Sequence, residues 1–138
     1  VYKRQNDTFA EAGRKPQNTV NAMRSLITAT RDLPTAPGSS VPNTSPPKVM
    51  IVSPPNCLPL PSVTGEGFPE LDDLIRWLPK LAKLYEELAI EQNTYFADAA
   101  KFCEPDPVDG LHLDVENTRK LGIGIAETIA LEGFADFC

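Results

Sequence analysis

One aspartate and one histidine, three residues apart, are the side chains of this 138-residue chain whose types and spacing suggest proton-transfer chemistry. His112 is the single histidine of the sequence, and Asp109 precedes it in a loop that also contains Gly110. Through a turn at Gly110, the Asp109 carboxylate can reach the imidazole, fix its tautomer and stabilise the imidazolium that forms when the ring takes a proton from a nucleophile. Alternatively, Asp109 forms an Asx turn and His112 is a solvated surface side chain. The spacing alone leaves both readings open.

The loop needs rigid elements on either side to hold these two side chains. Residues 94–98 form a short segment with aromatic side chains, which predicts a strand before the loop. Residues 115–131 predict a helix after the loop, with Asp114 as its N-cap and with Gly122 allowing close packing on a sheet. A loop between a strand and a helix is where open α/β sheets place their ligands.

Three further elements precede this loop. Apolar side chains at near-helical spacing predict an amphipathic helix over residues 18–33, and residues 34–47 are a Pro- and Ser-rich segment expected to form a surface loop. Residues 48–53 are a short apolar run, predicted as a central parallel strand buried on both faces. Residues 68–90 repeat the helical pattern, but Pro79 predicts a kink or two consecutive helices. Helix, strand, helix, strand and helix make half of a doubly wound α/β domain.

Composition limits the class of protein. A length of 138 residues with 41% hydrophobic residues fits one globular domain. The net charge of −6 argues against binding to nucleic-acid phosphates, and no apolar run approaches the roughly 20 residues of a membrane span. The three cysteines form no C-x-x-C pair, so neither a zinc site nor a disulfide scaffold is predicted. Such sparse cysteines favour a reducing, cytoplasmic compartment over a secreted one.

The block Asp-Gly-Leu-His-Leu-Asp at residues 109–114 resembles the Asp-x-x-His block of the SGNH (GDSL) hydrolases, in particular their arylesterase and perhydrolase branch. In that family the Asp and the His complete a Ser-His-Asp triad. The resemblance therefore implies that His112 is the general base and that Asp109 orients it. It also implies a flavodoxin-like three-layer α/β/α fold that is incomplete at the N-terminus, and a reaction that requires no cofactor or metal. The similarity continues in family order through residues 47–55, 84–89, 95–99 and 108–122.

The same resemblance assigns a role to one further position, Asn6. Asn6 matches the Asn of the family's Gly-x-Asn-Asp block, which donates to the oxyanion, although Arg4 stands where the family has Gly. A cap of a helix or turn is the alternative role for Asn6. Leu111, which lies between the two triad residues, is expected to face the substrate pocket. Residues 1–5 lack the apolar strand character that should precede the block, which raises the hypothesis that they are foreign sequence.

The family's nucleophile, a serine in a Gly-Asp-Ser block, has no counterpart in the sequence. Residues 1–138 are therefore interpreted as the C-terminal part of a single SGNH hydrolase domain, and the chain by itself is expected to be inactive. The parent protein is interpreted as a serine ester hydrolase that acts on a small-molecule ester through an acyl-enzyme, with acyl transfer or perhydrolysis as a variant. The alternative is a non-catalytic carbohydrate- or protein-binding module derived from such an enzyme. The branch resemblance also makes a homo-oligomer plausible.

Overall fold

The computed structural model describes residues 16–32, 47–59 and 69–132. Its elements follow the predicted order, with one short 3-10 helix after the second strand. The ends of the predicted helices and strands differ from the observed ends by no more than two residues, so each of these elements is confirmed. Along the chain they are α1 (Pro16–Asp32), β1 (Met50–Ser53), α2 (Pro69–Gln92), β2 (Tyr95–Asp98), η2 (Ala99–Lys101) and α3 (Val115–Leu131).

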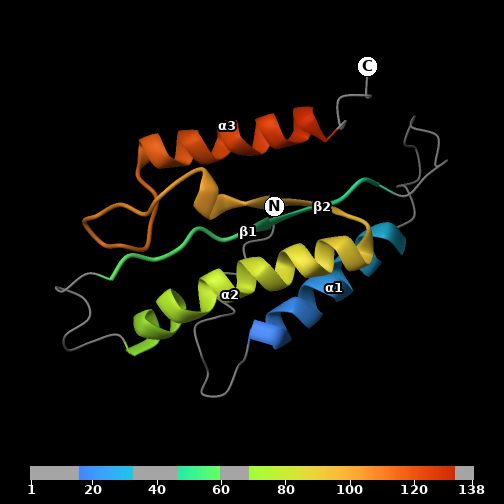
Figure 1. The fold of residues 1–138 in the computed structure, drawn as a ribbon, viewed down its shortest axis with the longest axis horizontal. Coiled ribbons are helices and arrows are strands. Elements are labelled where there is room, and N and C mark those ends of the chain that lie inside the picture. Colours follow the sequence, from blue (N-terminus) through green and yellow to red (C-terminus); the bar gives the residue numbers. More distant parts are fainter. Residues whose placement is uncertain (1–15, 33–46, 60–68, 133–138) are drawn as a thin grey trace.

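The two described strands lie side by side and run in the same direction. Met50 is opposite Tyr95 at one end of the pair, and Ser53 is opposite Asp98 at the other. Helix α2 covers one face of this pair and α1 packs against α2 on the same side, whereas α3 lies on the other side (Figure 1). The described residues therefore form three α/β/α layers, which confirms the predicted flavodoxin-like fold class.

Helix α2 carries the centre of the hydrophobic core. Its inward residues recur every three or four positions, which places them on one helical face. They pack with Ile51 of β1 and Ile27 of α1, each of which is 2% exposed. Burying one such side chain is worth about 1.5–3 kcal/mol, so this face holds α1 and the strands on α2. It consists of Leu74, Leu78, Leu81, Tyr85 and Leu88.

Pro79 lies inside α2 without dividing it, so the predicted alternative of two consecutive helices is wrong. A proline removes one backbone N–H, which here would have bonded the carbonyl of Ile75. Its neighbours Leu78 and Leu81 are fully buried, whereas Pro79 itself is exposed. Packing on both sides of the proline offsets the loss of that single hydrogen bond.

Strand β1 is fully buried on only one face. Ile51 and Ser53 are 2% exposed, whereas Met50 and Val52 are half-buried. Successive side chains of a strand point to opposite faces, and the face with Ile51 meets the core on α2. The prediction of burial on both faces is wrong, because the face opposite that core is covered less completely.

Helix α3 makes its close approach through Gly124 and not through the predicted Gly122. A Cβ atom at position 124 would overlap the ring of Phe102, whereas nothing lies within 4 Å of one at position 122. Two residues correspond to about 200° around a helix, so the two glycines face opposite ways. The expectation for Gly122 is therefore wrong, and Gly124 is the contact that lets α3 lie against the chain after β2.

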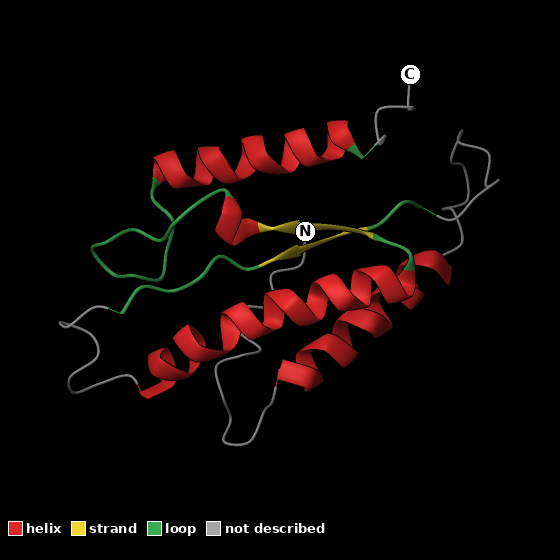
Figure 2. Cartoon of the chain, in the orientation of Figure 1, coloured by secondary structure: helices red, strands yellow, loops and turns green. Residues whose placement is uncertain are grey.

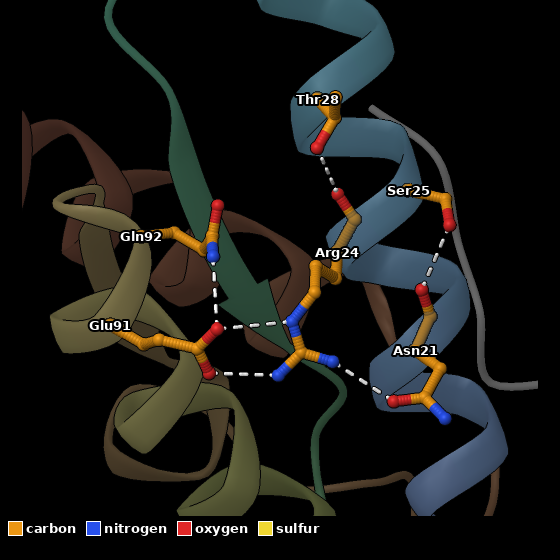
Figure 3. Close-up of polar contacts among 6 residues, drawn as sticks. All are labelled: Asn21, Arg24, Ser25, Thr28, Glu91 and Gln92. Carbon is orange, nitrogen blue, oxygen red and sulfur yellow. Dashed lines mark hydrogen bonds and ion pairs between the residues drawn. The ribbon is translucent and has the colours of Figure 1, made fainter.

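A polar cluster joins α1 to α2 at the surface (Figure 3). The guanidinium of Arg24 donates to both carboxylate oxygens of Glu91, at 3.1 and 2.8 Å, and to the side-chain oxygen of Asn21 at 2.9 Å. Arg31 donates to the carbonyl of Gln92 at 2.7 Å. The last carbonyls of a helix lack partners within it, so Arg31 caps α2 while Arg24 ties the two helices together.

Candidate active site

The Asp109–His112 block lies in the loop between η2 and α3, on the side toward which both strands run (Figure 2). Its backbone is held by three short hydrogen bonds. The N–H of Asp106 donates to the carbonyl of His112 at 2.7 Å, and the N–H of Gly110 donates to the carbonyl of Asp106 at 2.7 Å. The N–H of Leu58, in the chain after β1, donates to the carbonyl of Gly110 at 2.9 Å. The loop is thus fixed to itself and to the segment that follows the first strand.

Gly110 allows the turn that the sequence predicted. Its φ of 66° lies in the left-handed region that glycine adopts without steric cost. The chain therefore folds back at this residue, and the side chain before the turn meets the residues after it.

The Asp109 carboxylate uses both of its oxygens. Oδ1 accepts from the backbone N–H groups of Leu111 at 2.8 Å and of His112 at 2.9 Å, which is an Asx turn. Oδ2 lies 2.7 Å from Nδ1 of the His112 ring, so the predicted contact is present. The two readings of the sequence are therefore not exclusive, because one carboxylate forms the turn and also holds the imidazole.

These hydrogen bonds fix the charge of Asp109. The backbone N–H groups of His112 and Leu111, together with the His112 ring, lower the pKa of Asp109 from 3.8 to about 2. The carboxylate is therefore ionised near neutral pH and can only accept hydrogen bonds. A neutral His112 ring must then carry its proton on Nδ1, which leaves the lone pair on Nε2.

The His112 side chain is 71% exposed, and that of Asp109 is 45% exposed. The ring is thus accessible to a substrate or a nucleophile from solvent. Exposure also matches the alternative reading of a solvated histidine, so accessibility alone does not assign a role. Chemically, the pair can accept a proton at Nε2 and hold the resulting imidazolium beside a carboxylate.

The other predicted site residues have different outcomes. Leu111 is half-buried and packs against the hydrophobic core, and a pocket-facing role for it stays a prediction. Asn6 and residues 1–5 lie outside the described residues, so the structure tests neither the role of Asn6 nor the hypothesis that residues 1–5 are foreign sequence. Of the serines, two are described, and both hydroxyls are hydrogen-bonded. Ser25 donates to the carbonyl of Asn21 at 3.1 Å, and Ser53 donates to Asp98 Oδ1 at 2.8 Å.

Ser53 and Asp98 form a polar pair that the sequence reasoning missed. They are the last residues of the two strands and lie opposite each other. Ser53 also accepts from the N–H of Ala99 at 3.2 Å, and Asp98 accepts from the N–H of Ala100 at 3.2 Å, which starts η2. The available signal was that each residue is the polar end of a predicted strand. This pair fixes where the chain leaves the sheet for the candidate site.

In the described part of the chain, no three His, Cys, Asp or Glu side chains cluster in a way that could hold a metal ion. Cys57 and Cys103 are both buried. Burial raises the pKa of the Cys103 thiol, whose sulfur lies 3.4 Å from the carbonyl oxygen of Ala99. It is therefore not an activated nucleophile. None of the helices in residues 16–32 and 69–132 has both the length and the apolar character of a membrane span.

Solved structures of esterases resemble this chain. An aryl esterase from M. smegmatis has 33% sequence identity and a TM-score of 0.72, over 91% of this chain and 56% of that protein. A carbohydrate acetylesterase from Sinorhizobium meliloti has 30% sequence identity and a TM-score of 0.73. The match covers 92% of this chain and 57% of that protein. A carbohydrate acetylesterase family member from the same organism has 28% identity and a TM-score of 0.73, with coverage of 92% and 57%. No family model and no curated protein matches the sequence.

The chain spans 56–57% of the length of these three relatives. Both its sequence and its three-layer fold agree with theirs, and the predicted resemblance is confirmed. Over 91–92% of its length the chain is therefore similar to aryl esterases and carbohydrate acetylesterases of the SGNH hydrolase type.

Proposed function

We propose that this chain contributes to a serine ester hydrolase, with His112 as general base and then general acid. The observation that carries the proposal is the 2.7 Å contact between Asp109 Oδ2 and His112 Nδ1. It lies on an accessible loop beyond the strand ends, in a chain whose similar solved structures include esterases. Asp109 is the orienting partner, since its low pKa keeps it charged when the imidazolium forms beside it.

The proposed reaction has two stages. A hydroxyl transfers its proton to His112 Nε2 as its oxygen attacks the ester carbonyl, and the imidazolium then protonates the leaving alcohol. In the second stage water attacks the acyl-enzyme and gives its proton to His112, and the imidazolium then protonates the serine oxygen as its bond to the acyl group breaks and the acid leaves. We assign Asn6 as a side-chain donor to the oxyanion in both stages.

We propose that residues 1–138 form the C-terminal part of one SGNH domain, and that the attacking serine belongs to a Gly-Asp-Ser block that these residues do not contain. The proposed substrate is a small ester with a short acyl group, in keeping with the aryl esterase and the carbohydrate acetylesterases that resemble the chain. Acyl transfer or perhydrolysis follows if an alcohol or a peroxide replaces water. A homo-oligomer stays a prediction, for which light scattering is the measurement.

The test is hydrolysis of an aryl acetate by two purified proteins, the 138-residue chain alone and the same chain joined to a family-like segment that carries Gly-Asp-Ser. Each is assayed with and without a serine-directed inhibitor. We expect turnover only from the joined protein, and we expect the inhibitor to abolish it. Inhibitor-sensitive turnover by the chain alone would show that one of its own serines attacks. A joined protein that binds sugars or protein without turnover would favour the binding-module alternative.

A further inference from the structure

Asn117, on the first turn of α3, contacts both ends of the loop that carries His112. Its side-chain oxygen accepts from the backbone N–H of Glu104 at 3.1 Å, where the loop begins. Its side-chain nitrogen donates to Asp114 Oδ1 at 3.0 Å, where the loop ends. A single amide group therefore connects the backbone of Glu104 with the side chain of Asp114, ten residues further along the chain.

Each end of this connection is itself well anchored. Asp114 is the N-cap of α3, and its Oδ1 also accepts from the backbone N–H of Asn117 at 2.6 Å. Before Glu104, the ring of Phe102 packs against Gly124 on the same helix. The beginning and the end of the loop are thus both anchored on α3.

Between these ends the loop closes on itself next to the candidate base. The backbone N–H of Asp106 donates to the carbonyl of His112 at 2.7 Å, only two residues from each bond of Asn117 along the chain. Relative movement of the two loop ends would strain this bond first, and then the contact between Asp109 and His112. Because the His112 side chain is 71% exposed, burial does not hold that contact against competition from water. The backbone must hold it.

Asparagine suits this position because its amide has both an acceptor and a donor. Alanine would lose both bonds, whereas it would keep the backbone N–H that Asp114 caps. Aspartate would keep an acceptor for Glu104 but would place a second carboxylate beside Asp114. Comparing asparagine, alanine and aspartate at position 117 therefore distinguishes the effect of the connection across the loop from the effect of the cap on α3.

We propose that Asn117 is a positioning residue for the Asp109–His112 pair. It holds the two ends of the loop at the separation that lets the Asp109 carboxylate meet the imidazole. Its relevance to catalysis rests on the proposed esterase function, but its effect on the pair does not.

The test uses the fact that the chain has one histidine, so that ¹⁵N-histidine labelling gives a single pair of ring nitrogens in NMR spectra. In the wild-type chain near pH 8, we expect the ¹⁵N shifts of the Nδ1–H tautomer. Asn117→Ala should mix the two tautomers and move the two ring ¹⁵N shifts toward each other, since the loop ends are released. Asn117→Asp should have a smaller effect in the same direction. Asn21→Ala, which removes a comparable amide from the Arg24 cluster on α1, should leave the His112 signals unchanged.

Wild-type His112 signals in both Asn117 variants would overturn the proposal. Circular dichroism controls for loss of α3, and if Asn117→Ala unfolds, Asn117→Asp decides alone, because an acidic residue in the first turn favours a helix. No ester is needed for this measurement. A protein that fails to hydrolyse esters but shows the expected NMR changes would therefore refute the proposed function and leave the positioning role standing. In an active joined protein, Asn117→Ala should lower kcat about tenfold and leave KM unchanged.

Discussion

Two pairs in this molecule each join a carboxylate to a basic side chain, one between two helices and one within a loop. Arg24 and Glu91 are 67 positions apart in the sequence and tie α1 to α2 through two hydrogen bonds (Figure 3). Asp109 and His112 are three positions apart and meet across one turn of a loop. Both pairs have closely spaced partners, and all four side chains are at least one-third exposed.

The pairs differ in whether the basic side chain can exchange a proton. The hydrogen bond to Glu91 raises the already high pKa of Arg24, and that to Arg24 lowers the pKa of Glu91, so both charges are fixed at any ordinary pH. The imidazole of His112, by contrast, can accept a proton at one nitrogen while the other contacts Asp109, which is ionised beside it. The first pair can only hold helices together, whereas the second can also carry out proton transfer. Similar distances thus serve different purposes, which the residue types decide.

The largest expected effect comes from removing the imidazole ring. In the joined protein with a Gly-Asp-Ser block, His112→Ala should lower kcat on an aryl acetate by about 10³- to 10⁶-fold and change substrate binding little, since the attacking hydroxyl loses its base. Arg24→Ala serves as the control from the other pair and should leave kcat within about threefold of wild type. A His112→Ala variant that keeps more than about a tenth of the turnover would remove His112 from the mechanism.

The next effect comes from neutralising the carboxylate beside that ring. Asp109→Asn should lower kcat by up to about 10⁴-fold, because the imidazolium loses its charge partner while the turn keeps an acceptor for the backbone N–H groups. Near-wild-type kcat would restrict Asp109 to its Asx turn.

Acid stability provides a second measurement on the same variant. The pKa of Asp109 in the folded chain, about 2, lies below its ordinary value of 3.8. The ionised form therefore stabilises the fold fully above about pH 4, and this contribution disappears as the pH falls through about 2. Stability of Asp109→Asn, followed by circular dichroism over this range, should accordingly fall less on acidification than that of the wild type.

The contrast between the pairs also explains what the sequence could predict. The contact between Asp109 and His112 is local, so spacing and one glycine showed that it could form, and the family resemblance favoured it over a solvated histidine. The helices and strands were likewise predictable, because periodicity and caps are properties of neighbouring residues. The bond between Arg24 and Glu91 depends on how two helices lie on each other, and no local pattern in the sequence specifies that.

The errors have the same origin. Periodicity placed Gly122 on the inward side of α3, whereas Gly124, which faces the opposite way, is the glycine that packs on Phe102. The apolar run of β1 could not show which face of the strand would be covered. Asn117 resembled an ordinary residue near a helix start, because its partner Glu104 lies on the far side of the loop.

The two glycines of α3 give a matched test of how the loop region is anchored. Gly124→Ala should lower the free energy of unfolding by about 1–3 kcal/mol, because the added methyl forces the Phe102 ring or the helix to move. Gly122→Ala should instead raise it by up to about 1 kcal/mol, since that position is open and alanine favours a helix. Urea unfolding measures both. Equal effects of the two substitutions would contradict the close approach at Gly124.

The smallest expected effect comes from breaking the fixed-charge pair. Glu91→Gln keeps the shape of the side chain but removes the charge that faces Arg24, so we expect only a slight decrease in the urea midpoint, because the pair is exposed to solvent. That decrease should shrink as salt is raised from about 0.05 to 0.5 M, since counterions already screen an exposed pair. The ¹⁵N signals of His112 should not change at either salt concentration, because the helix pair and the loop pair share no residue. A shift of the His112 signals in Glu91→Gln would show that the two pairs are coupled through α2 and the strands, and their separate roles would then have to be abandoned.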